Sequence, residues 1–206
     1  NECSSLTQVS FATPSSLTCI EMETFNKCSS LTQISIPSSV KKIRDNAFSE
    51  CSSLSQISIP FSVYLIGSCA FFKCSSLTQV SFATPSSLTF IGNDAFAQCS
   101  SLTQILIPSS VKSIGDFAFA RCSSLSQISI PSSAKSFGDH IFYKCYLLND
   151  LCDDETYNTE DKINFLFNNI GISIATFILY AFIFFGWFKI YDWLSIIYPW
   201  FEHGYK

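Results

Sequence analysis

The chain has 206 residues, a formal net charge of −4, ten cysteines and only two histidines. Its length accommodates one repeat domain and an appendage. Residues 1–149 carry eight acidic and nine basic side chains, and this near-neutral balance argues against a nucleic-acid partner. No nucleophile elbow, phosphate-binding glycine loop or set of metal ligands is present in the sequence. We therefore expect a protein that is not an enzyme and has no metal or other cofactor.

Seven cysteines recur along the chain with separations of 25, 23, 23, 25, 23 and 23 positions. They are Cys3, Cys28, Cys51, Cys74, Cys99, Cys122 and Cys145. Six of the seven are followed by Ser-Ser-Leu, then Thr or Ser, then Gln. A fixed period in this range is typical of a solenoid, in which one structural unit stacks on copies of itself.

The unit that begins at Cys28 contains the elements we expect in every coil. Ile34 and Ile36 alternate with polar residues, which predicts a half-buried strand, and Pro37 ends it by removing a backbone donor. Val40 and the apolar residue three positions later predict a second, shorter segment that faces the interior. A glycine usually follows, which predicts a tight corner, and then an Ala-Phe pair on one helical turn.

No single unit of this length can bury its apolar residues alone, so neighbouring units must bury them jointly. We therefore predict a solenoid over residues 1–149, with six repeats and a partial seventh. The length of the repeat and its L-x-x-I-x-I core resemble the leucine-rich repeat family. This resemblance implies a right-handed, β-rich leucine-rich-repeat superhelix of parallel strands with short turns and helical corners. The two longer units insert Phe-Ala-Thr-Pro at 11–14 and 82–85, where we expect a bulged turn to absorb two extra residues.

The pattern C-x-x-L-x-x-I-x-I-P-x-S-V-x-x-I-G-x-x-A-F resembles the BspA-like (treponemal-type) leucine-rich repeat surface protein family. The resemblance covers residues 3 to about 148. It departs from the commonest leucine-rich repeat, because proline replaces the stretch that leads to the buried asparagine. It implies a cell-surface protein that binds host matrix, other cells or ligands, although repeat identity alone does not specify a ligand.

Residues 150–162 hold six acidic side chains and one basic side chain, which predicts a solvated linker. A metal site at Asp153, Asp154 and Glu155 is the alternative, but the EF-hand spacing and its central glycine are missing. We therefore predict no metal here.

A hydrophobic segment follows over residues 163–206. Residues 170–188 contain no charge, and as a helix they would span about 28 Å, close to the thickness of a bilayer core. A buried core helix is the alternative, but a solenoid of this size offers no interior to receive it. Lys189 after the span and the acidic residues before it favour a cytoplasmic C-terminus with the repeats outside. Because Asn1 lies at a repeat boundary, we also expect a longer parent chain.

The cysteine spacing predicts a column of buried free thiols, one per coil, and the alternative is a disulfide framework. Three cysteines lie off the column, at Cys19, Cys69 and Cys152. A Cys145–Cys152 bridge that closes the end of the solenoid remains open.

The outward residues of the first strands predict a ligand-binding face. We expect it to consist of Gln33, Ser35, Gln56, Ser58, Gln79, Ser81, Gln104, Leu106, Gln127 and Ser129. An amide ladder that only stabilises the sheet is the competing interpretation, since this face has no aromatic or charged anchor. Two further patterns are an aromatic patch and a basic stripe, each of which ordinary surface variation would also explain. They comprise Tyr64, Phe90 and Phe117, and Lys41, Lys42, Arg44, Lys112 and Lys135.

Together these features predict a membrane-anchored protein of the plasma membrane or cell surface that binds a protein or cell-surface ligand and mediates adhesion. The alternative is an intracellular, tail-anchored scaffold or signalling adaptor. Reduced buried cysteines and the lack of an N-glycosylation sequon favour that alternative.

Overall fold

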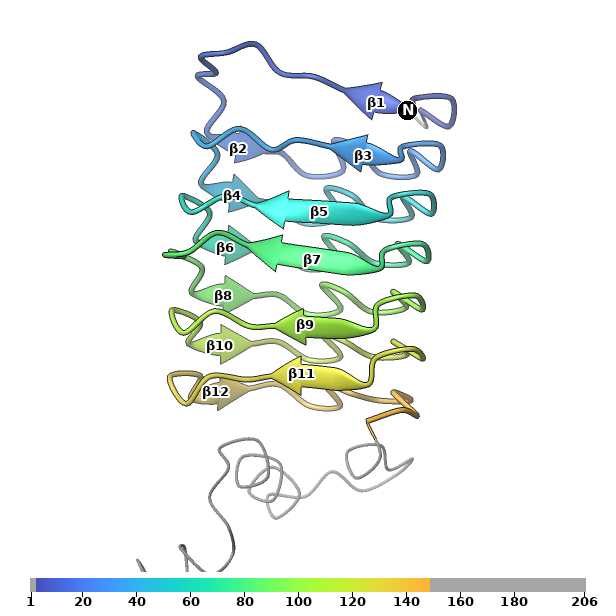
Figure 1. Ribbon diagram of the computed structural model, residues 1–206, viewed down its shortest axis with the longest axis vertical. Helices are drawn as coiled ribbons and strands as arrows, with labels where there is room; N and C mark the ends of the chain where they lie inside the picture. The colour runs from blue at the N-terminus through green and yellow to red at the C-terminus, as the bar shows by residue number, and fades with distance from the viewer. Residues whose placement is uncertain (1–2, 149–206) are drawn as a thin grey trace, which may run out of the picture. The chain divides into compact units, whose positions relative to one another are not determined.

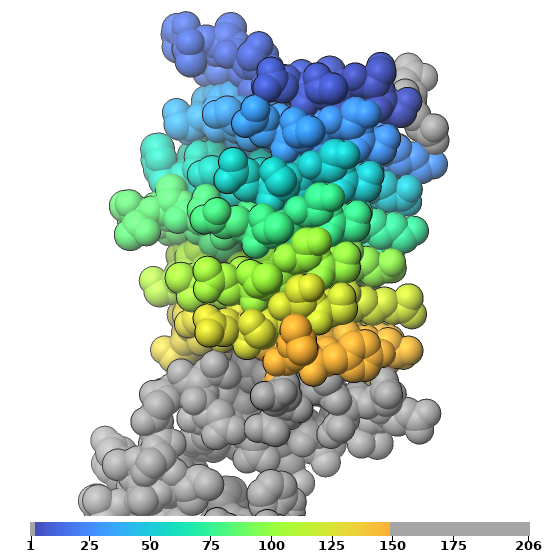
Figure 2. Space-filling view, turned by 45° about the vertical axis from the view of Figure 1, so that its right-hand side comes forward, coloured from blue at the N-terminus to red at the C-terminus, as the bar shows by residue number. Residues whose placement is uncertain are grey.

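The computed structural model describes residues 3–148, which form a stack of similar coils (Figure 1). Each coil has a front strand and a back strand. The front strands are β1 (Gln8–Val9), β3 (Gln33–Ile34), β5 (Gln56–Ile59), β7 (Gln79–Phe82), β9 (Gln104–Leu106) and β11 (Gln127–Ser129). The back strands are β2 (Cys19–Ile20), β4 (Lys42–Ile43), β6 (Leu65–Ile66), β8 (Phe90–Ile91), β10 (Ser113–Ile114) and β12 (Ser136–Phe137). In the space-filling view the coils lie as successive layers (Figure 2).

All pairing between coils is parallel, as the repeat predicts. The back strands form one six-stranded sheet in the order β12-β10-β8-β6-β4-β2. The front strands pair as β1 with β3, β5 with β7 and β9 with β11. Equivalent residues face each other across these pairs, for example Gln56 and Gln79, or Ile66 and Ile91. The predicted parallel solenoid is confirmed, and the shorter second segment of each repeat is a strand.

The helical corners predicted for each coil are wrong. In the segment that follows each back strand, the chain forms consecutive turns, and the described residues contain no helix. The N–H groups of Asn46 and Phe48 donate to the carbonyls of Ser68 and Ala70 in the next coil, at 2.9 and 2.8 Å. The N–H of Ala47 between them bonds back three residues. Because alternate donors serve the neighbouring coil, the i to i−4 bonds of an α-helix cannot form.

Buried phenylalanines form a continuous column through the stack. Neighbouring ring centroids lie 5.2, 5.2, 5.1, 5.4 and 6.0 Å apart, and the rings are nearly parallel. The column contains Phe25, Phe48, Phe71, Phe96, Phe119 and Phe142. Leucines, isoleucines and cysteines form similar buried columns beside it. Burying one such ring contributes about 2–3 kcal/mol, so the superposed columns account for much of the stability.

In the longer coil that begins at Cys74, the two extra residues lie in the connection between β7 and β8, which projects from the stack (Figure 1). The register is intact on both sides of it, because Val80 pairs with Ile57 and Ile91 pairs with Ile66. Leu88, at the end of the connection, is fully buried. The insertion therefore leaves the inward-facing residues in place, as predicted.

A glycine follows four successive back strands because the coils approach too closely for a side chain. Asn93 Oδ1 accepts a hydrogen bond from the N–H of Asp116 at 3.0 Å, and this oxygen occupies the space of a Cβ at Gly115. Asp45 relates to Gly67 in the same way, accepting from Ser68 at 2.8 Å. The predicted tight corner is thus a close contact between coils.

Serine hydroxyls in the turn after the front strand also connect neighbouring coils. Ser39 and Ser62 donate to carbonyls 22 residues earlier, at 2.7 and 2.6 Å. Ser133 does so at 3.0 Å. Among the described residues, Ser110 Oγ is the one buried side-chain polar atom without a hydrogen-bond partner. Its equivalent acceptor would be the carbonyl of Leu88, which lies at the end of the longer connection.

No helix within residues 3–148 is long and apolar enough to cross a membrane. The predicted linker at 150–162 and the predicted span at 170–188 lie outside the described residues.

We predict that Gly115→Ala destabilises the protein by about 1–3 kcal/mol, the usual cost of overpacking. The added Cβ would lie 2.6 Å from the backbone nitrogen of Asn93, so the coils would have to separate. Urea unfolding measures this change. Ser113→Ala in the same coil serves as the control and should change the free energy of unfolding little. Equal stability of the two variants would contradict the close-contact explanation.

We predict different results for two equivalent serines. Ser62→Ala should lower the free energy of unfolding by about 1 kcal/mol, because it removes a hydrogen bond. Ser110→Ala should cost less than half of that or increase stability, because its hydroxyl is already buried without a partner. The same unfolding measurement compares them, and equal losses would show that the hydrogen bond to the previous coil contributes nothing.

Candidate functional site

The ten residues predicted to bind a ligand all lie on the front face, the outward side of the front strands. The register places Gln56 beside Gln79, and Gln104 beside Gln127. Nine of the ten side chains are exposed, and Ser81 is partly exposed. The structure therefore brings the predicted residues together on one surface, while their role in binding remains a prediction.

A shallow front groove of about 520 Å³ crosses the first four coils of this face. It is lined by Gln8, Val9, Ser10, Gln33, Ile34, Ser35, Gln56, Ile57, Ser58, Gln79 and Ser81. The last four predicted residues lie farther along the stack and do not line the groove. One of them, Leu106, is 70 % exposed where the other coils have serine.

The front groove consists of neutral amides and hydroxyls. No glutamine side chain of this column forms a hydrogen bond with another described residue. The amide ladder that only stabilises the sheet stays the competing interpretation. The amides keep their donors and acceptors available, and this suits the recognition of another backbone or of polar side chains.

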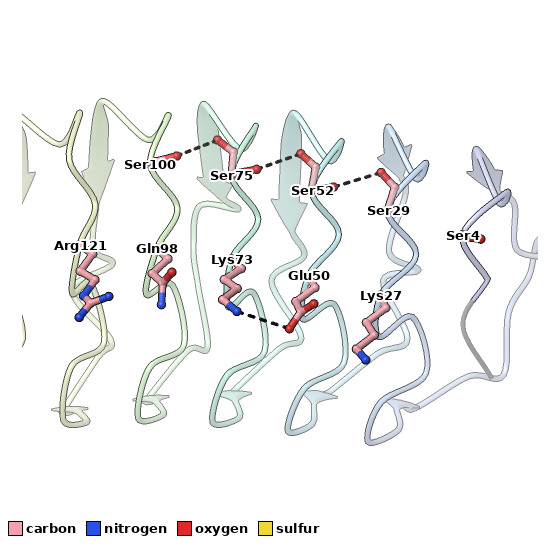
Figure 3. Close-up of a pocket in the computed structure, with 10 residues that line it drawn as sticks. All are labelled: Ser4, Lys27, Ser29, Glu50, Ser52, Lys73, Ser75, Gln98, Ser100 and Arg121. Atoms are coloured by element: carbon pink, nitrogen blue, oxygen red, sulfur yellow. Dashed lines mark hydrogen bonds and ion pairs between the residues drawn. The ribbon is translucent and has the colours of Figure 1, made fainter.

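A larger side groove of about 720 Å³ runs along the stack beside the front face (Figure 3). One wall carries the serines Ser4, Ser29, Ser52, Ser75 and Ser100, and the other carries Lys27, Glu50, Lys73, Gln98 and Arg121. The hydroxyls of Ser52, Ser75 and Ser100 each donate to the serine carbonyl of the preceding coil at 3.4–3.5 Å. Lys73 Nζ lies 3.7 Å from Glu50 Oε1, an exposed pair of modest strength.

Sequence reasoning missed this side groove. Its long polar residues directly precede the repeat cysteines, and all five have a positive φ of 56–62°. A periodic signal was available, because the residue before each buried cysteine is always long and polar although its charge varies. The wall includes both charge signs, so it favours no single class of ligand.

Six of the seven repeat cysteines belong to the core, and Cys3 is the exception. The thiols of Cys51 and Cys74 donate to the carbonyls of Phe25 and Phe48, at 3.1 and 3.2 Å. Burial is the largest cause of the raised thiol pKa of Cys51 and Cys122, and it raises each from 9.0 to about 12. A thiol that resists ionisation is a poor nucleophile and a poor metal ligand.

The predicted column of buried free thiols is confirmed at Cys28, Cys51, Cys74, Cys99 and Cys122. Cys3 is exposed, Cys19 and Cys69 are partly exposed free thiols, and the Cys145 thiol donates to the carbonyl of Phe119 at 3.0 Å. Cys152 lies outside the described residues, so its proposed bridge to Cys145 stays a prediction. Over residues 3–148, no three His, Cys, Asp or Glu side chains gather as a metal site.

His140, the one histidine within residues 3–148, packs against aromatic rings. Its ring stacks on Phe117 at 5.1 Å and meets the edge of Tyr143 at 6.1 Å between centroids. The two exposed grooves, in contrast, offer hydrogen-bonding groups and charged side chains for binding.

We predict that stability falls between pH 9 and 12 through the buried thiols. Because the folded pKa of Cys122 is raised above the unfolded value, the folded state holds a proton that the unfolded state releases in this range. Full stability is therefore present below pH 9. At pH 10.5 the loss should be about 1–2 kcal/mol for this thiol.

Urea unfolding at pH 8 and pH 10.5 measures the loss, and Cys122→Ala should reduce the difference between the two pH values. Lysine and tyrosine titration is common to both proteins and cancels in the comparison. An unchanged pH difference in the variant would contradict this prediction.

Comparison with known proteins agrees with this fold. Residues 1–86 and 80–179 match the family described as BspA type leucine rich repeat region, in six copies. The leucine-rich repeat protein TpLRR of T. pallidum is 31 % identical, with a TM-score of 0.62 over 69 % of this chain and 71 % of that one. No curated protein matches the chain.

Two further solved structures are similar over 69 % of this chain, which spans less than half of either relative. A leucine-rich repeat protein from Bacteroides ovatus is 32 % identical, with a TM-score of 0.53 over 42 % of its length. A leucine rich cell surface protein from Faecalibacterium prausnitzii is 26 % identical, with a TM-score of 0.55 over 46 %. The repeat pattern, the solenoid and these matches agree, and the chain belongs to the BspA-type leucine-rich repeat family.

Proposed function

We propose that this chain is a membrane-anchored cell-surface protein that recognises a protein partner through its repeats, mediates adhesion and performs no chemistry. The observation that carries the proposal is the front face, where successive coils present exposed amides and hydroxyls that form few bonds within the protein. Parallel pairing spaces these groups at about 4.8 Å per coil. A partner therefore meets a preorganised surface, and little conformational entropy is lost on binding.

The polar face is suited to protein recognition and poorly suited to nucleic acid. Its groove contains no charged side chain, whereas binding to nucleic acid depends on clustered lysine and arginine. Hydrogen bonds from amides satisfy polar groups of another protein, and the exposed Leu106 adds apolar contact area.

The membrane anchor in this proposal is residues 170–188, and the support for it is the uncharged sequence of this segment. Lys189 on one side and the acidic residues of 150–162 on the other favour repeats outside and a cytoplasmic C-terminus. A relative described as a cell surface protein, from Faecalibacterium prausnitzii, is consistent with this placement.

An intracellular, tail-anchored scaffold or signalling adaptor is the second candidate. Free thiols in the described core favour it, because exterior proteins commonly oxidise their cysteines. Burial also explains how such thiols stay reduced outside the cell. Surface display is therefore compatible with the same observation.

Protease treatment of intact cells tests the proposed location. We expect an added protease to remove an epitope within residues 1–149 while a cytoplasmic control protein survives. A C-terminal tag after Lys206 should remain protected and stay in the membrane fraction after an alkaline carbonate wash. Repeats that survive while a known exterior marker is digested would reject the surface location and favour the scaffold.

A further inference from the structure

Two neighbouring coils differ from the others at one place on the surface, where they carry exposed aromatic side chains. Phe61 occupies a turn position at which three other coils have serine, namely Ser38, Ser109 and Ser132. Tyr64 occupies a position that elsewhere holds lysine or threonine, at Thr18, Lys41, Thr89, Lys112 and Lys135. Phe90 aligns on the back sheet with Cys19, Lys42, Leu65, Ser113 and Ser136.

These three residues, which we call the aromatic cluster, lie on adjacent coils where the front-to-back turn meets the back sheet. The carbonyl of Phe61 accepts from the N–H of Ser87, and that of Tyr64 accepts from the N–H of Thr89, both at 3.0 Å. Phe90 follows Thr89 directly and opens β8, beside β6. The cluster thus brackets the connection that projects from the stack between β7 and β8 (Figure 1).

The aromatic cluster has no evident role in the core. Phe61 is 55 % exposed, and Tyr64 and Phe90 are each 37 % exposed. Every other coil builds the same backbone with serine, threonine, lysine or another residue at these positions. Exposed aromatic rings gathered at one place are typical of an interaction site, and tyrosine is among the residues that contribute most to binding.

The outward residues beside the cluster on the back face carry only positive charge. Two columns of outward residues run along the back face. One contains residues 18, 41, 64, 89, 112 and 135, and the other contains residues 19, 42, 65, 90, 113 and 136. Together they hold four lysines and no acidic residue. They are Lys41, Lys42, Lys112 and Lys135. Lys42 Nζ lies 5.5 Å from the Tyr64 ring centroid. The nearby acidic residue Glu21 is paired with Arg44 at 2.9 Å. Charge complementarity therefore favours an acidic partner.

We propose that the aromatic cluster and its lysines bind an acidic segment of a partner protein that also presents an aromatic or large apolar side chain. This inference rests on the proposed function as a protein-binding molecule and names the partner's chemistry. The rings supply apolar contact near the centre of the site. The lysines form the charged rim, which speeds association and selects against basic partners.

Binding to an immobilised copolymer of glutamate and tyrosine, poly(Glu,Tyr), tests the proposal with the full chain purified in detergent. The test variant combines Phe61→Ser, Tyr64→Thr and Phe90→Ser, and each new residue already occupies the equivalent position in another coil. We expect the variant to fold and to bind at least about tenfold more weakly, the loss usual for a hot spot.

Phe117→Asn is the control, because it removes a partly exposed aromatic ring outside the cluster, and asparagine tolerates the positive φ of 54° there. Its affinity for poly(Glu,Tyr) should equal that of the wild type. A second variant combines Lys42→Ser and Lys112→Thr, again with residues from the same columns. It should associate more slowly and show a weaker dependence on salt.

Two further polyanions, heparin and a polyglutamate that contains no tyrosine, identify the class of ligand. We expect both to bind more weakly than poly(Glu,Tyr) and to be insensitive to the loss of the three rings. The proposal is overturned if the triple variant binds the copolymer as well as the wild type does, or if either polyanion binds as tightly. Protease treatment of cells reports location independently, so failure of this inference is distinguishable from failure of the proposed function.

Discussion

Hydrogen bonding from each coil to the next is the interaction on which the rest of this structure depends. It operates on every side of the coil: between the front strands, across the continuous back sheet, and in the side turns, where Asn46 and Phe48 donate to the following coil. Because these bonds fix the separation of the coils all round, equivalent residues must superpose. The phenylalanine column and the buried thiols follow from that constraint, as does the glycine beside Asn93.

The same constraint divides the chain into positions that the fold determines and positions that it leaves open. Inward residues such as Leu54 and Phe71 must match their neighbours above and below, because a change of volume at one coil alters its contacts with two others. Outward residues have no such requirement. A surface departure confined to two adjacent coils, as at Tyr64 and Phe90, therefore indicates recognition more clearly than any feature shared by all the coils.

Sequence alone predicted most of the fold, since the period of 23 or 25 residues indicates a solenoid and the alternating apolar residues of each unit indicate a strand. The register at Val80 is intact around the insertion. It failed at the side turns, because the apolar spacing around Phe48 resembles a helical turn and a single unit cannot reveal that its donors serve another coil. The front residues were placed correctly, but whether Gln56 bonds to its neighbour depends on side-chain geometry. The side groove was missed because Lys27 and Glu50 look like ordinary surface variation.

In the side turns, residues with a positive φ also form the polar wall of the side groove. Positive φ in a residue with a side chain costs about 1–2 kcal/mol, and glycine or asparagine would lower that cost. Asn46 occupies one such position. Glu50, Lys73 and Arg121 occupy others, and their long side chains do not lower the cost of a positive φ. Contacts offset part of this cost, since Lys73 lies 5.1 Å from the Phe72 ring centroid and 3.7 Å from Glu50. The polar wall of the side groove therefore consists of residue types that a left-handed backbone disfavours, and turn geometry alone does not explain its composition.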